Sequence, residues 1–147
     1  MGLVDYFLKI EGIDGESADK TYANWIEISS FSWGATQSAT TGGTGGGAGA
    51  GKVSMQDFHF VMNFQKASPL LFKSCATGEH IKTGILVGRN NRTGQEDFLK
   101  ITLSDLLVSS YQAGGSSDII PTDQVSLNFS KIEIGGVWFD GTTNTVG

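Results

Sequence analysis

Apolar and polar side chains alternate along most of this chain, and no other feature constrains its fold as strongly. In residues 3–11 the apolar members of the alternation are Val4, Tyr6, Leu8 and Ile10, and in residues 52–64 they are Phe58, Phe60, Met62 and Phe64. A period of two residues is typical of a β-strand with one buried face. The same pattern covers residues 25–38, 81–87, 95–103, 106–111 and 124–137. The sequence therefore predicts about seven short strands.

The alternation changes phase at two places, between Ile28 and Phe31 and between Phe129 and Ile132. A slip of one residue would turn the buried face of a strand toward solvent, so a β-bulge at each place is the simplest explanation. Bulges are also what curved and closing sheets need. The pattern therefore favours a mainly β fold, an antiparallel sandwich or small barrel, over a parallel α/β sheet.

One segment departs from the alternation and predicts a single short helix. Ser68 and Pro69 are typical of an N-cap residue followed by proline at the first helical position, and Gly78 is typical of a helix end. With 147 residues the chain has the length of one domain with one core, which we place at residues 1–147.

Residues 40–51 form the most unusual stretch, because seven of these twelve residues are glycine and none has a large side chain. Such a run cannot fill a core and is predicted to be a long mobile loop. Gly46, Gly51 and Lys52 match the spacing of a phosphate-binding loop, but Val53 stands where that loop needs a hydroxyl to hold magnesium. Strand alternation follows instead of a helix, so nucleotide binding is not predicted. Residues 114–123, rich in Gly, Ser and Asp, are predicted to form a second loop.

The sequence offers no constellation typical of catalysis or of metal binding. Its two histidines, His59 and His80, stand in no pattern of metal ligands, and no Gly-x-Ser-x-Gly nucleophile motif occurs. Cys75 is the single cysteine, so no disulfide can form within the chain, and we interpret it as a buried, inert thiol. We therefore expect no enzyme activity, no cofactor and no metal site.

Charge and hydropathy exclude two further classes of partner. The chain carries a net charge of -5, and its basic residues are scattered singly, whereas nucleic-acid-binding domains gather them into a stripe. No stretch approaches the roughly 20 apolar residues of a membrane span. The N-terminal residues lack the basic and apolar regions of a signal peptide. We expect a protein made in the cytoplasm that leaves the cell, if it does, without a signal peptide.

A series of short motifs runs in the same order as in a known family of proteins. The motifs are Leu8–Ile10, Gly15–Ser17, Phe31–Gly34 with Gln37–Ser38, Gly47–Val53 with Gln56–Asp57, Ser68–Pro69 with Cys75–Ala76, Leu107–Ser110 and Val125–Phe129. They resemble the haemolysin-coregulated proteins (Hcp), which form the inner tube of bacterial type VI secretion systems. The resemblance covers nearly the whole chain.

The resemblance implies a small antiparallel β-barrel of two sheets with one short flanking α-helix, as in phage tail-tube proteins. It further implies hexameric rings that stack into a hollow tube, which a contractile sheath propels behind a spike and which carries small effector proteins in its lumen. Head-to-tail contacts are the symmetry that generates such rings and filaments. The expected partners are further copies of the chain, sheath and spike proteins and effectors, without nucleic acid or membrane insertion. The resemblance implies a protein that is made in the bacterial cytoplasm and secreted into the extracellular space or into a target cell.

The resemblance also implies which residues carry assembly. In that family a long loop reaches a neighbouring ring or subunit. The residues in the position of that loop here are Thr41, Gly42, Gly43, Thr44, Gly45, Gly46, Gly47, Ala48, Gly49, Ala50, Gly51 and Lys52. Alternation after the phase change places Ser30 and Ser32 on the face of the strand opposite to that of Phe31. We predict that these two serines face the lumen.

Three alternatives stay open at this point. The chain could be the tail-tube protein of a phage or of an extracellular contractile particle, an enzyme or effector with its own activity, or a carbohydrate-binding sandwich that uses Trp25, Trp33 or Trp138. One departure from the family also needs an explanation, because relatives keep a further strand after the one ending near Ile134. Here the corresponding residues are followed by a short polar C-terminal tail at 140–147.

Overall fold

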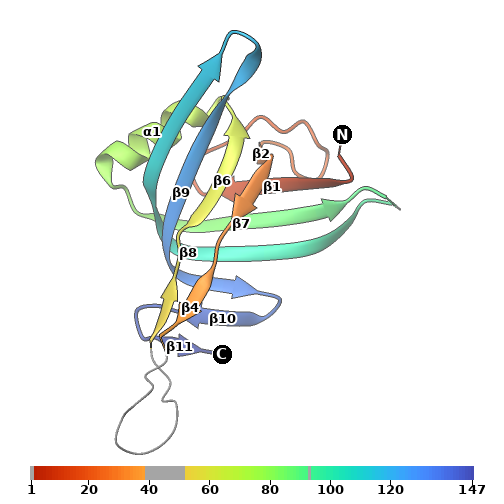
Figure 1. Cartoon of the computed structure of the whole chain (residues 1–147). Helices are drawn as coiled ribbons and strands as arrows, with labels where there is room; N and C mark the ends of the chain where they lie inside the picture. Colours follow the sequence, from red (N-terminus) through yellow and green to blue (C-terminus); the bar gives the residue numbers. More distant parts are fainter. Residues whose placement is uncertain (1, 39–51, 93) are drawn as a thin grey trace, which may run out of the picture.

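The computed structural model describes residues 2–38, 52–92 and 94–147 and shows a strongly curled antiparallel sheet with a helix at its side (Figure 1). The elements are β1 (Val4–Ile10), β2 (Ile26–Ile28), β3 (Ser30–Ser32), β4 (Ala35–Gln37), β5 (Val53–Met55), β6 (Phe58–Asn63), α1 (Ala67–Thr77), β7 (Ile81–Asn90), β8 (Glu96–Ser116), β9 (Ile119–Ile134), β10 (Val137–Asp140) and β11 (Thr145–Val146). The long loop predicted at residues 40–51 lies outside the described ranges.

Within the described ranges, nine strands form one sheet and two form a separate ribbon. The main path runs β11-β10-β9-β8-β7-β1-β2, while β6 pairs with both β3 and β9, and β4 pairs only with β5. Because β2 pairs with β1 while the next strand, β3, pairs with β6, the sheet curls back on itself without full hydrogen-bonded closure. The predicted mainly β class with two antiparallel sheets and a flanking helix is confirmed, with the barrel left open along this line.

The first phase change is a change of partner strand, where a bulge was expected. The segment pairs with β1 up to Ile28, the strand is interrupted at Ser29, and pairing with β6 begins at Ser30. Ser29 keeps contact with β6, because its backbone N–H donates to Val61 O at 2.8 Å. The phase change in the sequence therefore marks the bend between β2 and β3, where one segment passes from one part of the sheet to another.

The second phase change occurs in two paired strands at once. The register between β8 and β9 is the same on both sides of it, with Leu103 opposite Ile132 and Leu106 opposite Phe129. Between them Asp105 adopts a φ of +50°, a left-handed conformation that is uncommon outside glycine. Both strands therefore exchange their buried and exposed faces at the same level. The ladder continues there without a register shift, so the bulge expected at this place is absent.

Buried apolar side chains fill the inside of the curl. Phe58, Phe60 and Met62 of β6 are fully buried, as their alternation predicted. Phe31 adds a half-buried ring whose centroid lies 5.8 Å from that of Phe58. Phe64 was expected on the same face but is exposed, because β6 ends at Asn63 before reaching it.

The helix α1 begins two residues earlier than predicted. Its N-cap position is Lys66, and Ser68 lies inside the first turn, fully buried. The Ser68 hydroxyl accepts a hydrogen bond from the backbone N–H of Gln65 at 2.9 Å and donates one to the buried carboxylate of Asp123. Ser68 therefore anchors the helix to β9 and does not act as its N-cap. The helix end at Gly78 is confirmed, with a φ of 66° in the left-handed region that glycine tolerates.

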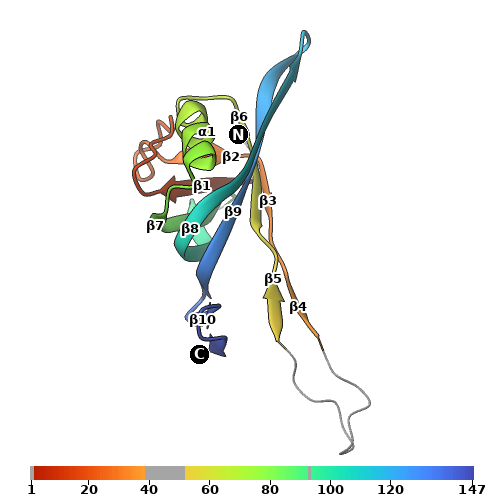
Figure 2. The same cartoon turned by 90° about the vertical axis from the view of Figure 1, so that its left-hand side faces the viewer.

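Two arms project from opposite ends of the molecule (Figure 2). One is the outer part of the β8–β9 hairpin, which contradicts the predicted loop at 114–123, since only Ser117 and Asp118 form the turn. The other is the β4–β5 ribbon, in which Gln37 pairs with Val53. Glycine and serine do not prevent β8 and β9 from pairing, because the ladder bonds are made by the backbone.

The expected loss of a strand after Ile134 is wrong. The chain turns at two glycines and returns as β10, which pairs with β9 through Val137 opposite Ile134. The end of the chain then adds β11 to β10, with Val146 opposite Phe139.

None of the described residues belongs to a helix with the length and hydropathy needed to cross a lipid bilayer.

Candidate functional site

Most of the predicted assembly loop, Thr41 to Gly51, lies outside the described residues. Its last member, Lys52, is described and is exposed immediately before β5. The two flanks of the loop meet closely, because the backbone N–H of Ser38 donates to Lys52 O at 3.4 Å. The predicted loop thus starts and ends at the outer end of the β4–β5 ribbon.

Ser30 and Ser32 are both exposed on β3, while Phe31 between them turns toward the core. They lie directly opposite Val61 and His59 of β6. The outward direction of the two serines agrees with their parity, and their position facing a lumen stays a prediction.

The structure adds residues to this face that sequence reasoning missed. Across the ladder from Ser32 the outward positions are His59 of β6, Ser126 of β9 and Ser110 of β8. His59 Nδ1 lies 3.1 Å from Ser126 Oγ. A row of polar side chains, three serines and one histidine, therefore continues over four strands. In the sequence only the alternation of polar residues within each strand indicates it.

A carboxylate at one border of this polar face is held by hydrogen bonds. Asp57 accepts from the hydroxyl of Ser109 at 2.7 Å and from the side-chain amide of Asn128 at 2.9 Å. Because both carboxylate oxygens have partners, Asp57 fixes β8 and β9 to the start of β6.

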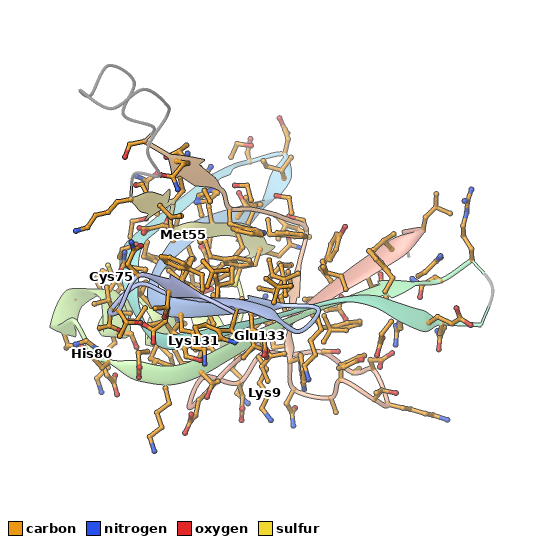
Figure 3. All side chains as sticks on the ribbon, turned by 90° about the horizontal axis from the view of Figure 1, so that it is seen from below. Lys9, Met55, Cys75, His80, Lys131 and Glu133 are labelled. Atoms are coloured by element: carbon orange, nitrogen blue, oxygen red, sulfur yellow. The ribbon has the colours of Figure 1, made fainter. Side chains whose placement is uncertain are left out.

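A cleft with an apolar smaller part and a more polar larger part opens at the end of the molecule that carries the β4–β5 ribbon. It consists of two adjoining pockets of about 180 and 550 Å³ that share Val53, Met55 and Phe139, and we call it the lower cleft. Figure 3, seen from below, shows Met55 on one side of the β9–β10 ribbon and Lys131 and Glu133 on the other. Those two charged side chains therefore face away from the cleft.

The three tryptophans lie at packed positions. The ring of Trp25 packs edge-on against Tyr22 at 4.8 Å, and Trp33 and Trp138 line the smaller pocket of the lower cleft. Lys131 Nζ lies 5.0 Å from the centroid of the Trp138 ring. The three rings do not form one shared platform of the kind that stacks on a sugar.

The described residues include no group of three or more His, Cys, Asp or Glu side chains placed to hold a metal ion. His59 is on β6 and His80 lies between α1 and β7. Cys75 is half-buried on α1 and packs against the core, so it is less buried than predicted.

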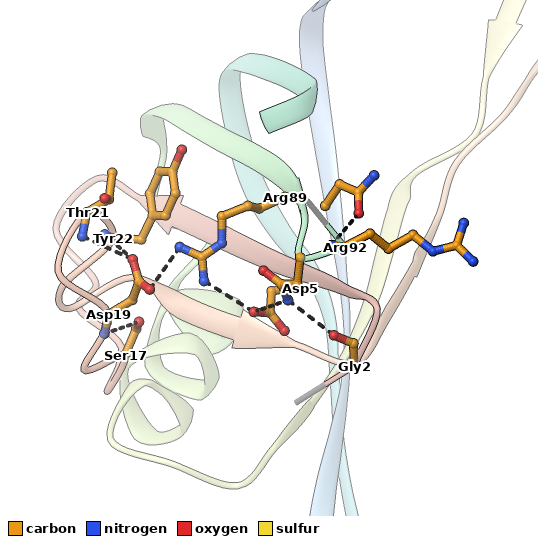
Figure 4. Close-up of polar contacts among 10 residues, drawn as sticks. Gly2, Asp5, Ser17, Asp19, Thr21, Tyr22, Arg89 and Arg92 are labelled. Atoms are coloured by element: carbon orange, nitrogen blue, oxygen red, sulfur yellow. Dashed lines mark hydrogen bonds and ion pairs between the residues drawn. The ribbon is translucent and has the colours of Figure 1, made fainter. Parts of the chain in front are cut away.

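The strongest polar cluster of the described part surrounds Arg89 of β7 (Figure 4). Its guanidinium donates to Asp19 at 2.8 Å and to Asp5 at 3.2 Å, and the residue is only 5% exposed. The guanidinium carbon also lies 4.9 Å from the ring centroid of Phe7 and 5.9 Å from that of Tyr22. The cluster fastens the segment that links β1 and β2 onto the sheet.

Two neighbours of Arg89 have shifted pKa values. Burial and a hydrogen bond to Asp97 raise the pKa of Tyr22 to about 12, so its hydroxyl stays a donor. Burial opposes the charged form of Asp19, but hydrogen bonds from Arg89 and from the backbone of Tyr22 and Thr21 outweigh it and lower the pKa of that carboxyl.

This shift predicts a loss of stability in acid. A carboxyl whose pKa is lowered by folding stabilises the native state fully above its unfolded pKa, near 3.8, and loses this contribution as the pH falls through its folded pKa. We expect the drop in unfolding free energy between pH 5 and pH 3 to be smaller in Asp19→Asn than in the unmodified protein, as measured by urea denaturation. Equal drops in both proteins would contradict the role of Asp19.

Solved structures share this curled sheet with its helix. The chain superposes on Hcp1 from Salmonella typhimurium with a TM-score of 0.85 at 35% identity, covering 99% of this chain and 100% of that one. A type VI secretion system effector from Yersinia pestis gives a TM-score of 0.73 at 29% identity, covering 92% and 89%. The fold therefore defines a β-rich component of the type VI secretion system.

Sequence comparison gives the family. Residues 7–135 match the family described as "Type VI secretion system effector, Hcp". Protein hcp1 of Pseudomonas aeruginosa strain PAO1 is 39% identical over 133 residues, which are 89% of this chain and 82% of that protein. The chain belongs to the Hcp family, among the tube proteins of the type VI secretion system. The resemblance drawn from the sequence motifs is confirmed.

Proposed function

We propose that the chain assembles as hexameric rings that stack into a hollow tube, is secreted when the machine contracts and carries small effector proteins in its lumen. Membership of the Hcp family is the observation that carries this proposal. It favours the secretion system over the tail tube of a phage and over a carbohydrate-binding sandwich. The role is structural and needs no catalytic group or cofactor.

The shape of the chain supports a role in assembly. Two arms extend in opposite directions from one curled sheet (Figure 1). A contact between unlike surfaces of identical copies repeats by rotation into a ring or by translation into a filament. In this proposal residues 41–52 act in contacts between rings or subunits, and the sheath and spike are further partners.

The polar face of β3, β6, β9 and β8 supports the assignment of the lumen. Ser30 and Ser32 belong to it, together with His59 and Ser126. A wall of small, mostly uncharged side chains offers hydrogen bonds to a passing protein without holding it by strong charge.

The mass of the purified protein in solution tests this proposal. We expect light scattering at increasing concentration to give a particle of about six chains, as the proposed hexameric ring, closed by head-to-tail contacts, requires. A monomer at every concentration would contradict the ring.

A further inference from the structure

Two exposed apolar surfaces stand at opposite ends of the molecule. At the outer end of the β8–β9 hairpin, Ile119 and Ile120 are 62% and 65% exposed, and we call residues 118–121 the hairpin tip. At the other end Val137 and Val146 border the lower cleft and are 61% and 64% exposed. Apolar side chains gathered at such protruding positions are typical of interaction surfaces.

The two surfaces differ in form. Because adjacent residues of a strand point to opposite faces, Ile119 and Ile120 make the hairpin tip apolar on both sides. The lower cleft is concave, and its smaller pocket is lined by apolar residues of β5, β9, β10 and β11. A narrow projecting tip and an apolar recess have complementary shapes.

Their charges are complementary as well. The hairpin tip carries one exposed acid, Asp118, since nearby Asp123 is fully buried and bonded to Ser68. Among the described residues that line the lower cleft, only Lys52 is charged. Lys131 and Glu133 face away from the cleft, as Figure 3 shows.

We propose that the hairpin tip of one copy docks into the lower cleft of a second copy, with Ile119 and Ile120 against its apolar wall and Asp118 beside Lys52. This proposal rests on the proposed function, because it assumes that the chain associates with itself, and it names the surfaces that meet. The outer end of the β8–β9 hairpin and the strands β5 and β10, which line the lower cleft, lie at opposite ends of the chain (Figure 2). The contact therefore leaves a free tip and a free cleft for further copies.

The first test removes the apolar part of the contact. We expect Ile119→Ser/Ile120→Ser to keep the Tm of the unmodified protein, because both side chains are exposed, but to need at least about tenfold higher concentration to associate in light scattering. The matched control is Phe72→Ser, which removes a 60% exposed apolar side chain from α1 and should leave association unchanged. Unchanged association of the isoleucine variant overturns the docking.

The second test exchanges the charges. Asp118→Lys and Lys52→Asp should each weaken association, and the two changes together should restore it. A double variant that associates no better than the single ones also overturns the docking. If the unmodified protein and all variants form rings and tubes alike, only the docking fails, whereas an unmodified protein that stays monomeric contradicts the proposed function as well.

Discussion

Replacing Arg89 by leucine is expected to lower the free energy of unfolding by about 3 kcal/mol, because it leaves two carboxylates without the buried cation that joins them. The guanidinium reaches Asp5 on β1 and Asp19 in the following segment, and it also lies over the ring of Phe7. Leucine keeps apolar contact with that ring but offers no donor. Urea denaturation at neutral pH measures the effect.

Two control variants separate the role of this cluster from that of charge in general. Arg89→Lys keeps the charge but not the fork of donors that bonds two carboxylates, so its loss should be smaller than that of leucine but measurable. Arg92→Leu, at the neighbouring turn where the side chain is exposed, should unfold like the unmodified protein. A loss under about 0.5 kcal/mol in Arg89→Leu would contradict the proposed role of the cluster.

Deleting Gly42 to Gly49 is expected to leave the sheet folded and to reduce ring stacking and secretion at least about tenfold. The deleted residues carry no large side chain that could fill a core. In the proposed function this loop acts through its length and its backbone hydrogen bonds. Tm reports the fold, and sedimentation of tubes together with the amount of protein in the culture medium reports assembly.

The matched control for the deletion keeps the length and changes the sequence. A loop in which Gly42 to Gly49 are shuffled among themselves retains the same backbone reach and should stack like the unmodified protein. If the deleted variant still builds tubes and is secreted in normal amounts, the role given to the loop is wrong.

Local patterns were enough to predict much of this fold. The alternation in β1 and β6 placed Leu8, Ile10, Phe58 and Phe60 correctly in the core, because a strand has the same period wherever it lies. Gly78 marked the end of α1, since its left-handed conformation is a property of one residue.

Errors arose where a distant partner decides the structure. Ser68 looks like an N-cap in sequence, but the buried carboxylate of Asp123, 55 residues away, draws it into the helix. The outer β8–β9 hairpin has the composition of a loop, because its stability comes from backbone pairing, which composition does not report.

The candidate surfaces depended on distant pairing even more. Strand parity gave the direction of Ser30 and Ser32, but joining them to His59 and Ser126 required the register of β3, β6 and β9. The lower cleft forms only when β10 returns beside β9, next to the β4–β5 ribbon. The spacing of residues along the sequence does not predict a surface of this kind.

Electron microscopy of the purified protein tests the central claim most directly. The account predicts rings with six subunits and, at higher concentration, hollow tubes made of stacked rings. Fields that contain only single chains, or particles without a central channel, would contradict it.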